Sequence, residues 1–112
     1  MIIGVLEDGE VRLFDDIAEV IRAWGSYPDD VASEVIVFYD ADGVWFKPIL
    51  STGPKRWAGL RPSSKNFTLE RSDHPDPTVD PLSVALHQAT VLAPNRYFNS
   101  LAELRTRFPY EP

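Results

Sequence analysis

Short runs of β-branched and aromatic residues, each broken by a polar turn, dominate the first half of the chain. One such region covers residues 5–14 and turns at Asp8-Gly9, and a second covers residues 34–46 and turns at Asp42-Gly43. An Asp-Gly pair supplies the positive φ angle that tight hairpin turns need, and apolar flanks suit half-buried strands. The pattern therefore predicts two β-hairpins.

Between the hairpins the spacing of apolar residues changes from strand-like to helical. The residues that recur at i, i+3, i+4 and i+7 are Ile17, Val20, Ile21 and Trp24. This spacing places them on one face of a helix. Asp15 or Asp16 can cap its start, where acidic groups also suit the helix dipole, and Gly25 can end it. Residues 27–30 are then expected to form a loop.

The middle of the chain has weaker periodicity. Pro48 interrupts a strand-like run, so we expect that strand to be bulged or at an edge of the sheet at this residue. Residues 51–65 are rich in Ser, Gly, Pro and basic residues, which is typical of a long loop or a loosely paired hairpin. Residues 66–71 alternate like a strand, and residues 72–80 are expected to cross the surface as a loop.

Two further helices are predicted in the last third. Asp80 as cap and Pro81 at the first helical position favour a helix start there, with an apolar face continuing to Leu92 and a stop at Pro94. The sequence Ser100-Leu101-Ala102-Glu103 is a capping box, which predicts a helix over residues 100–108. Together these segments predict one α+β domain spanning residues 1–112. We expect a mostly antiparallel sheet built from hairpins, with about three helices packed on one face.

Composition restricts the chemistry that the chain can perform. The absence of cysteine from all 112 residues excludes disulfides, thiolate zinc sites and cysteine nucleophiles. The N-terminus has no basic region before its apolar residues, and no stretch approaches the length of a membrane span. We therefore expect a cytoplasmic protein that neither carries a signal peptide nor binds a membrane.

Charge is distributed unevenly along the chain. Residues 1–46 carry eleven acidic and two basic residues, whereas residues 47–71 carry six basic residues and one acidic residue. The acidic half would repel phosphates, which disfavours general binding of nucleic acid. It suits a basic protein partner.

Candidate catalytic and metal-binding groups are few. Asp80, Ser83 and His87 share one helical face by their spacing, but no glycine-rich turn presents the serine as a nucleophile. His74 lies among acidic residues in a proline-interrupted stretch, which is typical of turns rather than of a metal site. We therefore expect no catalytic residue, no metal and no cofactor.

The residues best suited to binding a partner are acidic groups and exposed aromatic rings. The expected set comprises Asp15, Asp16, Tyr27, Asp29, Asp30, Glu34 and Trp57. The five carboxylates would form an acidic patch if they converge, and such a patch speeds association with a basic partner. Tyr27 and Trp57 would act as apolar anchors, because aromatic rings beside charged groups are enriched at interfaces.

Residues 35–48 and 92–104 resemble parts of small bacterial proteins that act as immunity partners of polymorphic or contact-dependent toxins. The resemblance rests on size, acidity, α+β composition and the amino-acid sequence of these two stretches. It implies a non-enzymatic protein that binds a cognate toxin domain with a basic cleft and blocks it. In such a complex the acidic side chains would stand in for substrate phosphates.

Two alternatives from other functional classes stay open at this point. One is a small ligand-binding or enzymatic domain that uses the face of His87 and Asp80 and a pocket under residues 51–65. The other is a homodimeric structural or regulatory protein that associates through an edge strand near Pro48.

Overall fold

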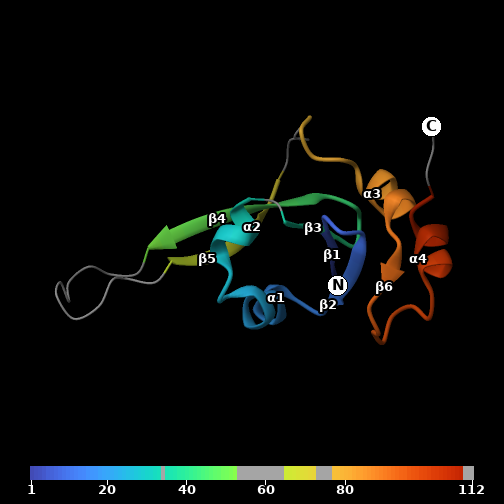
Figure 1. Cartoon of the computed structure of the whole chain (residues 1–112), viewed down its shortest axis with the longest axis horizontal. Coiled ribbons are helices and arrows are strands. Elements are labelled where there is room, and N and C mark those ends of the chain that lie inside the picture. Colours follow the sequence, from blue (N-terminus) through green and yellow to red (C-terminus); the bar gives the residue numbers. More distant parts are fainter. Residues whose placement is uncertain (34, 53–64, 73–76, 110–112) are drawn as a thin grey trace.

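The computed structural model describes residues 1–33, 35–52, 65–72 and 77–109. In these ranges the chain forms a mixed six-stranded sheet and four helices (Figure 1). The strands are β1 (Ile2–Leu6), β2 (Glu10–Phe14), β3 (Ile36–Asp40), β4 (Trp45–Thr52), β5 (Lys65–Arg71) and β6 (Val91–Leu92). The helices are α1 (Ile17–Trp24), α2 (Pro28–Ala32), α3 (Leu82–Gln88) and α4 (Leu101–Arg107). The predicted α+β class is confirmed.

The sheet has the order β5-β4-β3-β1-β2-β6, and every neighbouring pair is antiparallel except β2 with β6. Both predicted hairpins are present, and their turn glycines have the positive φ angles that the Asp-Gly pattern predicts, 95° at Gly9 and 85° at Gly43. The turns are tightened by aspartate: Asp8 accepts a hydrogen bond from the amide of Glu10, and Asp40 accepts from the amides of Asp42 and Val44. Local turn chemistry thus determines two of the strand pairings, β1 with β2 and β3 with β4.

Helices cover both faces of the sheet, which corrects the expectation of helices on one face. On one face Phe14 and Phe38 pack with Val20 of α1 and Val31 of α2. On the opposite face a second cluster contains residues from the sheet and from α3 and α4: Ile3, Val11, Tyr39, Leu82, Leu86 and Leu104. The reason lies in β1, where Ile2 and its neighbour Ile3 are both buried. Successive strand residues point to opposite faces, so a continuous apolar run requires cover on both sides.

The β4–β5 hairpin extends beyond the rest of the sheet. β4 pairs with β5 from Phe46 to Thr52, but with β3 only at Trp45 and Phe46. Pro48 therefore has a strand neighbour on one side only, where a residue without an amide hydrogen is tolerated. The expected edge at Pro48 is confirmed, and the hairpin interpretation of residues 51–65 holds at its base, where Thr52 pairs with Lys65.

Two helix boundaries are well explained by local sequence. The Asp16 carboxylate accepts a hydrogen bond from the amide of Glu19 at the start of α1, and the Ser100 hydroxyl accepts one from the amide of Glu103 at the start of α4. The Ser100 cap was predicted, and Asp16 is one of the two residues, with Asp15, that were expected to cap α1. Within the described ranges no helix has the length and apolar character that crossing a membrane requires.

Two other predictions about helices are wrong. Residues 28–32 form the short helix α2 rather than a loop, because Pro28 occupies a favourable first position and the following acids suit the helix dipole. α3 begins after Pro81 without a side-chain cap and ends at Gln88 rather than near Leu92. Val91 and Leu92 instead pair in parallel with β2, so a contact distant in sequence overrides the helical periodicity.

Candidate protein-binding site

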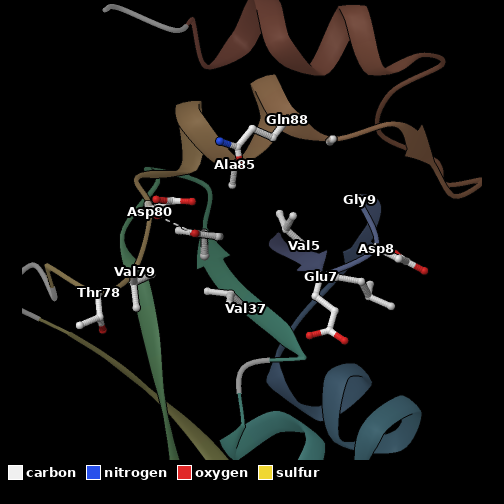
Figure 2. A pocket seen from close by; sticks show the side chains of 13 residues that line it. Val5, Glu7, Asp8, Gly9, Val37, Thr78, Val79, Asp80, Ala85 and Gln88 are labelled. Atoms are coloured by element: carbon white, nitrogen blue, oxygen red, sulfur yellow. Dashed lines mark hydrogen bonds between the residues drawn. The ribbon is translucent and has the colours of Figure 1, made fainter.

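A groove of about 410 Å³ opens between α3 and the face of the sheet that α3 covers (Figure 2). Val5 of β1 and Val37 and Tyr39 of β3 contribute sheet residues, and Ala85 of α3 and Ala89 just after it contribute the helix side. The groove lies on the face opposite to α1 and α2, because Val5, Val37 and Tyr39 pack with the α3–α4 cluster. A groove of this volume can accept one or two side chains of a ligand.

The two ends of the groove are held by specific hydrogen bonds. At one end the buried Tyr39 hydroxyl donates to the backbone carbonyl of Asp80 at 2.7 Å, which ties the segment before α3 to β3. At the other end the carbonyl of Gly9 accepts from the amide of Thr90 at 2.9 Å, just after α3. A β-carbon at Gly9 would lie 2.7 Å from the Thr90 hydroxyl, so the two backbones approach closely there. Both ends are therefore well defined.

Acidic residues stand at both ends of this groove. Glu7 and Asp8 lie on the β1–β2 turn, and Asp80 lies at the opposite end beside the start of α3 (Figure 2). All three residues are exposed. Among the described residues that line the groove there is no lysine, arginine or histidine. The groove consequently combines an apolar floor with negative charge at its ends.

A second candidate surface lies at α2 and contains three of the residues expected to bind a partner. Tyr27 immediately precedes α2 and is 55% exposed, and Asp29 and Asp30 are exposed in the first turn of the helix. The Tyr27 ring packs edge to face against Trp24 with ring centres 5.9 Å apart. We call Tyr27, Asp29 and Asp30 the α2 surface. The expected Glu34 and Trp57 lie outside the described residues.

Asp15 and Asp16 do not belong to the α2 surface. They precede α1, whereas the α2 surface follows its far end, and eight helical residues correspond to a rise of about 12 Å. Asp16 caps α1, and Asp15 forms an ion pair with Arg96 and accepts a hydrogen bond from Tyr97. The proximity of Arg96 reduces the negative charge that Asp15 presents to a partner.

The sequence spacing placed Asp80, Ser83 and His87 on one helical face, but the structure separates Asp80 from His87. Asp80 lies outside α3 and lines the groove, while the exposed His87 is not among the lining residues. No group of three metal-ligating side chains gathers within the described ranges. Most of the basic stretch and the pocket expected under residues 51–65 fall outside those ranges.

Sequence reasoning missed the groove because its lining comes from four separate segments. Two signals bear on it: the apolar run Ile2-Ile3-Gly4-Val5-Leu6, which indicates burial on both faces of β1, and the small residues Ala85 and Ala89 on one helical face. It also missed Arg105 of α4, whose guanidinium donates hydrogen bonds to carbonyls at the end of α3.

Comparison with protein-family models, curated proteins and solved structures gave no match to this chain.

Proposed function

We propose that this protein is a non-enzymatic binding protein that neutralises a basic protein partner, and that the partner is a bacterial toxin domain. The α2 surface carries this proposal, because it places an exposed aromatic ring directly beside two exposed carboxylates. The resemblance of residues 35–48 and 92–104 to immunity proteins supports the choice of a toxin as partner.

The backbone of the α2 surface is held before any partner arrives. The amide of Tyr27 donates to the carbonyl of Trp24 at 2.9 Å, and the amide of Val31 donates to the carbonyl of Tyr27 at 3.2 Å. Val31 is itself buried in the core, which fixes the helix on the sheet. A surface held in this way loses little conformational entropy on binding, so more of the contact energy appears as affinity.

The chemistry of the α2 surface suits a basic cleft. Tyr27 offers a flat apolar ring with a polar hydroxyl, which is the type of side chain enriched at the centre of interfaces. Asp29 and Asp30 supply negative charge beside that ring, where they can pair with lysine or arginine of the partner. Bound in this way, the two carboxylates would occupy positions that substrate phosphates take in a toxin with nuclease activity.

The proposal is tested by isolating the partner and then reversing the charge of the α2 surface. Tagged protein is incubated with lysate of the source organism, washed at low and high salt, and the retained proteins are identified by mass spectrometry. We expect one stoichiometric basic protein that high salt removes, and inhibition of its activity by the purified chain. The double variant Asp29→Lys/Asp30→Lys should then slow association at least about tenfold.

The matched control is Glu70→Lys/Glu103→Lys, which changes the net charge equally at two exposed positions outside the α2 surface. This control should slow association much less. Equal effects of the two double variants would show that net charge alone governs binding and would remove the α2 surface from the proposal. A partner whose activity is unchanged in the complex would contradict neutralisation.

A further inference from the structure

The groove between α3 and the sheet has a floor suited to an apolar side chain. Val5, Val37, Val79 and Ala85 line it and are all partly exposed, so apolar surface is accessible to a ligand. Alanine at position 85 is decisive, because a larger residue on that side of α3 would project into the volume. Burial of one aliphatic side chain against such a floor contributes favourably to binding.

The ends of the groove determine the charge of the ligand. The carboxylates of Glu7 and Asp80 form no ion pair within the part of the chain that the structure describes. Asp8 adds a third exposed carboxylate beside Glu7, although it also accepts the amide hydrogen of Glu10. Negative charge at both ends, with an apolar floor between, complements an apolar residue that has basic residues on both sides.

The groove is also prepared for a ligand by the hydrogen bonds at its ends. Tyr39 fixes the position of Asp80, and the contact of Gly9 with Thr90 fixes the turn that carries Glu7 and Asp8. The walls therefore need little rearrangement when a ligand enters, and the entropic cost of binding is reduced. A rigid groove with two charged ends also discriminates between ligands of different charge.

We propose that this groove binds an extended segment of a protein in which an apolar residue is flanked by lysine or arginine. The site is separate from the α2 surface, because the two lie on opposite faces of the sheet. It does not depend on whether the partner at the α2 surface is a toxin.

The test uses a defined peptide probe, acetyl-Ala-Arg-Leu-Arg-Ala-amide, and the same peptide with both arginines replaced by citrulline. Citrulline preserves the size and planar shape of the side chain but removes its positive charge. Binding is followed by NMR titration of the methyl and amide signals of the full-length protein. We expect the arginine peptide to shift the methyl signals of Val5, Val37 and Ala85, and to bind at least about tenfold more tightly than the citrulline peptide at low salt.

Variants of the protein locate the site. Glu7→Gln and Asp80→Asn should each weaken the arginine peptide about threefold, and together about tenfold. The matched control Glu70→Gln/Glu103→Gln removes the same charge at two exposed positions outside both the groove and the α2 surface, and it should leave the affinity unchanged. Ala85→Met retains helix propensity but fills the floor, so it should abolish binding while the amide spectrum stays that of a folded protein.

Equal affinity for the two peptides, or shifts centred on Tyr27 instead of Val37, would overturn the proposal for the groove. Retained binding in Ala85→Met would overturn it as well. These results leave the proposed function standing, because that proposal is tested by Asp29→Lys/Asp30→Lys against an isolated partner. Conversely, failure of the α2 surface in that test leaves the peptide site unaffected.

Discussion

The two faces of the sheet are built in different ways. The face under α1 and α2 is assembled from elements that adjoin one another along the chain, and large aromatic side chains such as Phe14 and Phe38 fill it, with ring centres 6.0 Å apart. The face under α3 and α4 joins the start of the chain to its last third, and small residues of α3 leave a groove there. It relies on polar contacts at defined points, including those of Tyr39, Gly9 and Arg105.

This difference indicates a division of roles. The filled face provides stability that is spread over many apolar contacts, so small changes at its surface should be tolerated. The grooved face gives up part of its packing for an accessible cavity and compensates with hydrogen bonds between distant segments. The effects of substitutions on the two faces should therefore differ in magnitude and in how far they spread through the structure.

The largest loss of stability is expected from Phe38→Ala on the filled face. Phe38 is 1% exposed and contacts Phe14, so its removal leaves a cavity in the core under α1 and α2. The free energy of unfolding should fall by about 3 to 5 kcal/mol, measured by urea denaturation with circular dichroism. Ile21→Ala in α1 is the control, because Ile21 is 37% exposed and its truncation should cost less than about 1 kcal/mol. A similar loss of unfolding free energy in both variants would show that the filled face is not tightly packed.

Gly9→Ala should cost about 2 to 3 kcal/mol on the grooved face. Gly9 has φ of 95°, which strains any residue with a β-carbon, and the new methyl group would lie 2.7 Å from the Thr90 hydroxyl oxygen. Gly43→Ala is a close control, since φ is 85° but the nearest atom to the new methyl group, a Leu82 carbon, lies 3.8 Å away. It should show the backbone strain alone, about 1 to 2 kcal/mol. Equal losses in thermal or urea unfolding would show that the approach of Gly9 to Thr90 contributes nothing.

Arg105→Met should cost about 2 kcal/mol and should act mainly on α3. The guanidinium donates to the carbonyls of Leu86 at 2.8 Å and Ala89 at 2.6 Å, and these carbonyls lose a charged donor in the variant. Amide hydrogen exchange should accelerate in α3 more than in α1. Arg107→Met in the same helix removes an exposed guanidinium beside Phe108 and is the matched control. If amide hydrogen exchange accelerated equally in the sheet and in all four helices, Arg105 would not have a local role.

Local features of the fold could be predicted because single residues determine them. Asp8-Gly9 and Asp42-Gly43 specify their turns. Asp16 and Ser100 cap their helices because their side chains accept hydrogen bonds from amides only three residues further along the chain. The continuous apolar run of β1 also indicates burial on both faces, although the helices were expected on one. In each of these cases the physical cause lies within a few residues along the chain.

Other features depend on contacts that periodicity does not contain. α3 stops at Gln88 because Val91 and Leu92 pair with β2, some eighty residues earlier in the chain. The carbonyls at its end are satisfied by Arg105 from another helix. For the candidate sites the division is the same: Tyr27, Asp29 and Asp30 are neighbours in sequence and could be grouped, whereas Asp15 proves to be paired with Arg96. The groove could not be predicted, because no single segment contains its floor and both its ends.

Among the variants that test the two faces, controls aside, the smallest effect on stability and the most specific effect on the groove are expected from Tyr39→Phe. The substitution retains the buried ring but removes the hydroxyl that donates to the Asp80 carbonyl at 2.7 Å, so unfolding should require about 1 kcal/mol less. Because Asp80 then loses its anchor on β3, binding of the arginine peptide should weaken more than that of the citrulline peptide. Tyr97→Phe removes a hydroxyl hydrogen bond to Asp15 outside the groove and serves as the control. Unchanged discrimination between the peptides in Tyr39→Phe would mean that the groove does not depend on this link between β3 and the segment before α3.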